Sequence, residues 1–289
     1  MELASEFRYR DPILDRQTLV IAISQSGETM DTLMAVRHAR HQGSRVLSIC
    51  NTQGSTIPRE SDAALYTYAG PEIAVASTKA FLTQLVATHL FGMYLGQVRG
   101  NLFGDEIRSL VSDLASMPNK IDRVLDTMDP VRELARRLKD ASSVLFLGRH
   151  VGYPVALEGA LKLKELAYMH AEGFPAGELK HGPIALIEDG LPVISVMPSP
   201  RGRSLLHEKM ISNLQEIRAR GAYTIVIAEE GADGVEPYAD EIIWVPAVPT
   251  LMQPLVTTVP LQVFACELAT AKGHDVDQPR NLAKSVTVE

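Results

Sequence analysis

The sequence has 289 residues, enough for two domains of ordinary size, and its 46% apolar and 22% charged residues are typical of a globular protein. The formal net charge of −7 argues against a general surface for nucleic acid or anionic membranes, so an anionic ligand would need a local site. The two cysteines, Cys50 and Cys266, have no CxxC or Cys/His spacing, which argues against a disulfide framework and a zinc site.

The N-terminal segment MELASEFRYR has no apolar signal core. No uninterrupted apolar run reaches the roughly 20 residues that span a bilayer. We therefore expect a cytoplasmic protein without a membrane-spanning segment.

In the first part of the chain, short β-branched apolar runs alternate with helical patterns, as in βαβ units. The patterns predict a buried strand over residues 18–23, a helix over 29–42 closed by Gly43, strands over 45–50 and 63–68, and a long apolar helix over 79–97. Ser77 and Thr78 are expected to cap this last helix.

Residues 104–140 differ, because charged residues alternate there with Leu, Ile and Val at helical spacing. They predict one or two connecting helices, broken near Pro118 and Pro130. The patterns then restart, with strands over 143–147, 192–196, 223–228 and 241–245, and with helices over 153–169, 203–220 (closed by Gly221) and 255–272.

The repeated order indicates an internal duplication of a doubly wound parallel-sheet domain. The second copy begins with a strand, the turn GRHVG and a helix, which have no counterpart in the first copy. We predict two α/β domains of three flavodoxin-like layers, the first without its opening strand–helix unit. The expected boundaries are 1–103 and 141–274 for the domains, 104–140 for the connecting helices and 275–289 for a tail.

The stretch SQSGETMDT follows the first predicted strand and places Ser24, Gln25, Ser26 and Thr29 around Gly27. Ligands of open parallel sheets bind beyond the carboxyl ends of strands, and helix N-termini favour anions. Hydroxyl and amide groups could therefore hold a phosphate here. An ordinary helix cap is an equally good interpretation. The corresponding point of the second copy, PSPRGRS, has lost the pattern.

In the helix ALEGALKLKELAYMH, Glu158, Lys162 and Glu165 share one face. A solvated stripe of ion pairs is the simpler interpretation. The Gly- and Pro-rich segment that follows carries His170 and His181, and the pattern does not choose between them.

Residues 275–289 form a polar tail that contains Lys284. Such tails usually fray, and Lys284 would then be a solvated charge. Alternatively, Leu282, Val286 and Val288 dock the tail and bring Lys284 to a cleft, where its amine could add to a carbonyl.

Six motifs carry a resemblance: ASEFRYR, SQSGETMDT, VASTKAF, ALEGALKLKE, GELKHGP and DQPRNLAKSVTVE. Together they resemble, in order and over nearly the whole chain, the isomerase half of the glucosamine-6-phosphate synthases, the glutamine:fructose-6-phosphate amidotransferases. The resemblance implies two sugar isomerase (SIS) domains. It also implies a ketose–aldose isomerase that converts fructose 6-phosphate toward glucosamine 6-phosphate in amino-sugar synthesis, without a metal or cofactor.

The resemblance also implies roles for single residues. Lys284 would form a Schiff base with the open-chain ketose, Glu165 would move a proton between C1 and C2, and Lys162 would stabilise charge on substrate oxygens. His181 would open the sugar ring and reach the site from the neighbouring subunit of a homodimer. The substrate-binding positions would be Ser24, Gln25, Ser26, Thr29, Val75, Ser77, Ala283 and, as a weaker candidate, Glu158.

The chain departs from this family in two ways. It has no glutaminase domain, so ammonia would have to come from elsewhere, and it lacks the Gly-Thr-Ser turn of the family's first strand–helix unit. The alternatives are a non-catalytic sugar-phosphate-binding SIS module or an inactive fragment.

Overall fold

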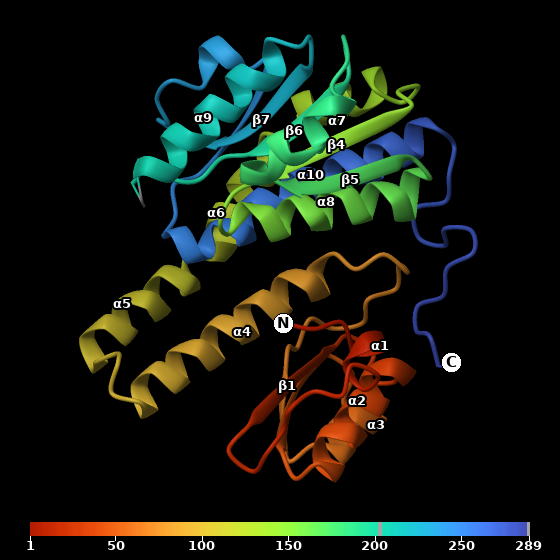
Figure 1. Ribbon diagram of the computed structural model, residues 1–289, viewed down its shortest axis with the longest axis vertical. Coiled ribbons are helices and arrows are strands. Elements are labelled where there is room, and N and C mark those ends of the chain that lie inside the picture. The colour runs from red at the N-terminus through yellow and green to blue at the C-terminus, as the bar shows by residue number, and fades with distance from the viewer. Residues whose placement is uncertain (202–203, 288–289) are drawn as a thin grey trace. The chain divides into compact units, whose positions relative to one another are not determined.

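The computed structural model describes residues 1–201 and 204–287, and the chain divides into two compact units. The first unit comprises Met1–Ile107 with Arg280–Glu289, and the second comprises Arg108–Pro279. Each is built on a parallel sheet flanked by helices (Figure 1), which confirms the predicted fold class. The four domain boundaries expected from the sequence stay predictions.

The first unit has three strands in the order β1-β2-β3, namely β1 (Leu19–Ser24), β2 (Arg45–Cys50) and β3 (Ala63–Tyr66). Its helices are α1 (Ala4–Phe7), α2 (Met30–His41), α3 (Thr56–Glu60) and α4 (Lys79–Val98), and α5 (Gly104–Ala115) begins in it. The helix α3 was not predicted, because a single turn is too short for its periodicity to show.

On one face of this sheet, Ala22 and Val46 pack against Leu33 and Val36 of α2. The helix α4 lies against β2 on the other face. The strand β1 is an edge strand, and its side chains alternate between the two faces. The burial predicted for residues 18–23 is therefore wrong on one face, where Leu19, Ile21 and Ile23 are 43%, 42% and 47% exposed.

The second unit has five parallel strands in the order β5-β4-β6-β7-β8. They are β4 (Ser143–Gly148), β5 (His170–Pro175), β6 (Pro192–Val196), β7 (Tyr223–Glu229) and β8 (Glu241–Val245). The sequence analysis missed β5, because Gly173 and Pro175 in HAEGFP suggest a loop. At the edge of a sheet, where β5 lies, both residues are tolerated.

The helices of the second unit cover both faces of its sheet. They are α6 (Met117–Asp126), α7 (Asp129–Arg137), α8 (Gly152–Ala167), α9 (Ser204–Arg218) and α10 (Gln253–Ala271). In Figure 1, α9 lies on one face, while α8 and α10 run side by side on the other. On the α9 face, Met210, Leu214 and Ile217 pack against Leu147 and Val226 of the sheet. The predicted first residue of this helix, 203, lies outside the described residues.

The connecting region forms three helices, α5 to α7, rather than one or two. Pro118 and Pro130 are the second residues of α6 and α7, in the first turn, where the missing N–H has no intrahelical partner to lose. They begin these helices instead of breaking one.

The segment Thr250–Ala271, which contains α10, is long and apolar enough to cross a membrane by length and composition. Its packing gives a different explanation, because it is 61% buried and contacts α8, α7 and α6. A central core helix is apolar on all sides for the same reason that a membrane helix is.

The two sheets share a detail that supports the internal duplication. In the first unit, the Asp62 carboxylate accepts a hydrogen bond from the Val46 N–H at 2.8 Å. In the second, the Asp240 carboxylate accepts one from the Thr224 N–H at the same distance. Both aspartates directly precede the last strand of their sheet, so β2 corresponds to β7 and β3 to β8, and β1 therefore corresponds to β6.

Candidate active site

The loop after β1 is held by its own hydroxyl groups. The Ser24 hydroxyl accepts a hydrogen bond from the Gly27 N–H at 3.1 Å, and it lies 3.4 Å from the Thr29 hydroxyl. The Ser26 hydroxyl accepts one from the Glu28 N–H at 3.2 Å. Because the loop is ordered before any ligand arrives, binding would cost little conformational entropy.

Gly27 is required at the tip of this loop. Its φ is +68°, and a Cβ there would lie 2.0 Å from the hydroxyl oxygen of Ser55. Only glycine combines this conformation with so close an approach.

The cap interpretation explains part of the loop. The helix α2 begins after Thr29 as the N-cap residue, but the Thr29 side chain caps no backbone N–H. The carbonyl of Gln25 accepts hydrogen bonds from the N–H groups of Asn51 and Thr52. The loop is thus fixed mainly by Ser24, Ser26 and the backbone.

The C-terminal tail docks on the same loop, within the first unit. The Ser285 hydroxyl lies 3.0 Å from the Ser26 hydroxyl, and the Val286 carbonyl accepts a hydrogen bond from the Met30 N–H at 3.0 Å. The Lys284 ammonium donates to the Ala74 carbonyl at 2.7 Å. The fraying interpretation is therefore wrong, and Lys284 is anchored between the first loop and the segment before α4.

The tail is held by polar contacts and not by the apolar side chains expected to dock it. Leu282 and Val286 are 45% and 54% exposed, and Ala283 is exposed as well. Val288 lies outside the described residues. Backbone and hydroxyl pairing cannot be inferred from hydrophobic pattern, which is why the sequence favoured a free tail.

The segment that carries Val75 and Ser77 is fixed by Glu72. Its carboxylate accepts hydrogen bonds from the N–H groups of Thr78 and Ala80, at 3.1 and 2.8 Å, and from the Ser77 hydroxyl at 3.4 Å. Thr78 is the N-cap residue of α4, as predicted, but neither its side chain nor that of Ser77 caps a backbone N–H, because both donate to Glu72, which caps the helix instead. An acidic residue ahead of VASTK was the signal that the sequence analysis missed.

In the second unit, α8 buries a lysine between two carboxylates. The Lys162 side chain is 3% exposed, and its ammonium lies 2.5 Å from Glu165 Oε2 and 3.5 Å from Glu158 Oε1. The solvated-stripe interpretation is therefore wrong. The spacing was recognised, but burial depends on neighbouring elements such as β5 and α10, which pack around α8.

Burial raises the pKa of the Glu158 carboxyl, while the positive charge of Lys162 opposes the shift and that of Glu165 adds to it. Two carboxylates and one ammonium leave this cluster with an excess negative charge when all are ionised. A buried group of this kind is costly for stability, and groups with perturbed pKa values cluster at functional sites.

His181 ends the 3₁₀ turn η1 (Ala176–His181) and is exposed. His170 is also exposed and lies at the start of β5, 3.4 Å from Glu172. The candidate residues thus form two sets, one in each unit. Ser24, Gln25, Ser26, Thr29, Val75, Ser77, Ala283 and Lys284 belong to the first, and Glu158, Lys162, Glu165 and His181 to the second.

Within the described residues, 1–201 and 204–287, no group of three or more His, Cys, Asp or Glu side chains could hold a metal ion.

Comparisons with known proteins identify the family of this chain. The SIS domain family model matches residues 1–94 and 137–272. The glutamine–fructose-6-phosphate aminotransferases [isomerizing] of Streptomyces coelicolor and Corynebacterium diphtheriae are 77% and 71% identical over the whole chain. The chain covers 47% and 46% of these two proteins, so it spans about half of their length.

Solved structures agree. The C-terminal domain of glucosamine-fructose-6-phosphate aminotransferase from Francisella tularensis is 39% identical with a TM-score of 0.90, and the match covers 96% of this chain and 77% of that one. A glucosamine-6-phosphate deaminase from Thermotoga maritima is 25% identical with a TM-score of 0.74, over 98% of this chain and 80% of that one.

Proposed function

The chain belongs to the SIS domain family and corresponds to the isomerase half of the glutamine–fructose-6-phosphate aminotransferases, and on this basis we propose that it isomerises fructose 6-phosphate toward glucosamine 6-phosphate. Ammonia would come from a glutaminase domain. Lys284 would act through a Schiff base with C2 of the open-chain ketose.

The docking of the tail carries the proposal. Lys284 is the only lysine of the described residues in the tail, and the neighbouring Ser285 contacts the hydroxyl loop through Ser26. A ligand phosphate on Ser24, Ser26 and Thr29 would thus be held beside the residue that supplies the amine. With Gln25, Val75, Ser77 and Ala283, these groups would form the substrate-binding part of the first unit.

The buried cluster supports a proton-transfer role for Glu165. A general base needs a carboxylate with a fixed position and a tuned environment, and the ammonium of Lys162 holds Glu165 at 2.5 Å. Lys162 would stabilise charge on substrate oxygens, Glu158 would tune this lysine from its other side, and His181 would serve ring opening.

Assembly is part of the proposal. We place His181 in the site of a neighbouring subunit, which requires a homodimer, the commonest closed assembly of soluble proteins. The proposed compartment is the cytoplasm, where amino-sugar synthesis would use the product.

Borohydride reduction tests the Schiff base directly. The amine of Lys284 adds to the C2 carbonyl with loss of water, and hydride then reduces the C=N bond to a stable secondary amine. Chains treated with fructose 6-phosphate and borohydride should gain one sugar phosphate on Lys284, as peptide mass spectrometry would show. The matched control is Lys79→Met, because Lys79 is exposed and lies two residues from Ser77.

Lys284→Met should abolish the labelling, and Lys79→Met should leave it unchanged. Labelling of another lysine with Lys284 unmodified would refute the assignment. Unchanged sugar-phosphate binding by Lys284→Met and Glu165→Gln, together with no isomerisation by the parent chain, would establish the binding-module alternative instead.

Mixing two inactive variants tests the shared site. Equal amounts of His181→Ala and Lys284→Ala chains give about half mixed dimers, each with one intact site and one doubly altered site, so roughly a quarter of the parent activity should return. Sites built within one chain would return no activity.

A further inference from the structure

The second unit contains a polar pocket at the position that corresponds to the hydroxyl loop of the first. Its volume is about 360 Å³, which is within the range of pockets for small ligands. The correspondence of β1 with β6 and of β3 with β8 places the loop after β6 opposite SQSGETMDT, and the segment after β8 opposite the one that carries Ala74. Both of these second-unit segments line the pocket.

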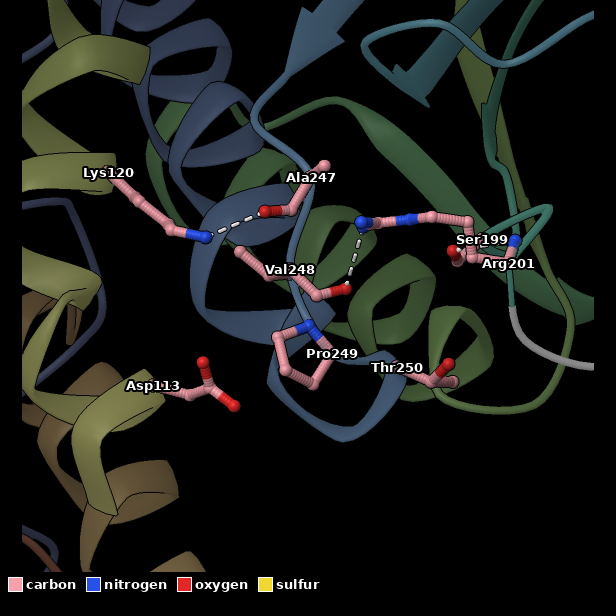
Figure 2. Close-up of a pocket in the computed structure, with 8 residues that line it drawn as sticks. All are labelled: Asp113, Lys120, Ser199, Arg201, Ala247, Val248, Pro249 and Thr250. Carbon is pink, nitrogen blue, oxygen red and sulfur yellow. Dashed lines mark hydrogen bonds between the residues drawn. The ribbon is translucent and has the colours of Figure 1, made fainter. Parts of the chain in front are cut away.

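In both units a lysine ammonium donates to a backbone carbonyl of the segment after the last strand, although the two lysines come from different elements. Lys284 donates to the Ala74 carbonyl at 2.7 Å, and Lys120 of α6 donates to the Ala247 carbonyl at 2.7 Å. Figure 2 shows Lys120 reaching this segment from one side and Arg201 from the other, where Arg201 donates to the Val248 carbonyl.

The two cations are fixed in place and still have N–H groups available to a ligand. One N–H of the Lys120 ammonium is used by Ala247, and the remaining two have no partner among the described residues. Arg201 is fixed by an ion pair from its Nε to Glu229 at 2.8 Å, and the Glu229 side chain is only 4% exposed. This buried carboxylate at the end of β7 holds the guanidinium in place, whereas the Lys120 ammonium forms no ion pair with the residues that the structure describes.

Hydroxyl and carboxylate groups complete the pocket lining. Ser199 is buried after β6, Thr250 precedes α10, and the Asp113 carboxylate lies on the side of Lys120 in Figure 2. A cationic end and an acidic or hydroxyl-bearing end together suit a ligand that carries both an anionic group and several hydroxyl or amino groups.

We propose that this pocket is a second, non-catalytic sugar-phosphate site, in which Lys120 and Arg201 bind the phosphate and Asp113, Ser199 and Thr250 bind hydroxyl or amino groups. Like the proposed catalytic site, this pocket has a lysine and hydroxyl groups at the ends of strands. Among its described lining residues, it has no counterpart of the paired carboxylates of α8. The proposal does not depend on catalysis at Lys284.

Thermal unfolding of the whole chain, followed by the fluorescence of Trp244, tests the site. Trp244 is the only tryptophan and lies in β8, so its signal reports the second unit. The test uses the background Ser26→Ala with Lys284→Met, which disables the first site. Glucosamine 6-phosphate at millimolar concentration should raise the unfolding temperature of this background, because any ligand that binds only the folded state stabilises it.

In Lys120→Met, the glucosamine 6-phosphate concentration at half-maximal thermal shift should be about tenfold higher or more. This change corresponds to the loss of one charge-assisted hydrogen bond. Arg123→Met, on the same helix but paired with Glu230 outside the pocket, should leave this concentration unchanged. Asp113→Asn should weaken glucosamine 6-phosphate and not inorganic phosphate, because only the sugar carries groups for a carboxylate.

No rise in unfolding temperature in this background, or an equal rise in Lys120→Met and Arg123→Met, would overturn the second site. Borohydride labelling of Lys284 in the parent chain separates the two proposals. Labelling of the parent chain with no thermal effect in the Ser26→Ala/Lys284→Met background would refute this pocket alone, and the thermal effect without labelling would refute the catalytic proposal alone.

Discussion

The strands β1 and β6 occupy corresponding places in the two units but differ in burial. Every residue of β6 is buried, since β4 and β7 flank it and helices cover both faces of the sheet. The strand β1 pairs only with β2, and Leu19, Ile21 and Ile23 on one of its faces are nearly half exposed.

The two strand sequences are equally apolar, so the difference in burial comes from the elements that surround each strand. LVIAIS and PVISV both have the composition of strands buried on two faces. In the first unit an apolar groove of about 480 Å³, lined by Leu19, Leu47 and Leu65 with Phe91 and Tyr94 of α4, remains at this face. Stability should therefore depend much more on the interior of the second unit than on this part of the first.

The largest expected effect is at Lys162, in the interior of the second unit. Lys162→Met would leave Glu158 and Glu165 buried without their cation, and the free energy of unfolding should fall by about 3–5 kcal/mol at pH 7. Urea unfolding followed by Trp244 fluorescence measures this. Lys164→Met, an exposed position on the same helix, should change it by less than about 0.5 kcal/mol.

The pH dependence of this variant sharpens the test. Burial already raises the pKa of Glu158 in the folded chain, and loss of the lysine should raise it further. A raised carboxyl pKa favours the folded state below the unfolded-state value and loses that contribution as the pH rises through the folded value. Lys162→Met should therefore recover stability between pH 7 and 5. A constant deficit would mean that lost packing, not charge, is the cause.

The second prediction compares β1 and β6 directly. Ile194→Ala removes a side chain that is 1% exposed, and we expect a loss of about 2–5 kcal/mol. Ile21→Ala removes one that is 42% exposed, so less than about 1 kcal/mol should be lost. The first is followed by Trp244 fluorescence and the second by far-ultraviolet circular dichroism. Equal losses would contradict the account of β1 as an open edge.

These contrasts also show what the sequence could predict. The order of most helices and strands along the chain, the duplication and the smaller first sheet follow from local periodicity, which survives in any context. Exposure of Ile21, burial of Lys162 and the edge strand β5 depend on which elements become neighbours, and one sequence does not contain that information. The interior of the second unit was therefore predicted less well than its element order.

The candidate site shows the same division. Ser24, Ser26 and Thr29 were proposed as site residues from their place after a strand, because that place is set by chain order alone. The capping role of Glu72 and the polar docking of Ser285 were missed, since both arise from contacts that carry no hydrophobic signal.

The third prediction concerns glycine in the first unit. Gly27→Ala should lose about 2–4 kcal/mol from left-handed strain together with the contact to Ser55, and it should weaken phosphate binding. Gly54→Ala is the matched control, because its φ is +74° but a Cβ there meets nothing within 4 Å. Strain alone should cost the control about 1–2 kcal/mol. Circular dichroism gives both values, and equal losses would show that the contact with Ser55 is unimportant.

The smallest expected effect is at the start of the last strand, where the units differ again. Glu241 of β8 receives a hydrogen bond from Arg137 at 2.5 Å and one from the Tyr223 hydroxyl at 2.8 Å, whereas the corresponding residue of β3 is Ala63. The bond from Arg137 holds the pKa of the Glu241 carboxyl below its usual value. A lowered carboxyl pKa stabilises the fold above the unfolded value of about 4.5, and this contribution disappears as the pH falls through the folded value.

Arg137→Gln should therefore destabilise the second unit at pH 7 by at most about 1 kcal/mol, because both partners are partly exposed. The difference from the parent chain should shrink below pH 4, as Glu241 becomes protonated in both. Urea unfolding of the two chains at pH 7 and pH 3.5, followed by Trp244 fluorescence, measures it, and 1 M salt should reduce the difference at pH 7. If the difference in the free energy of unfolding grew on acidification, its origin would lie outside the Arg137–Glu241 pair.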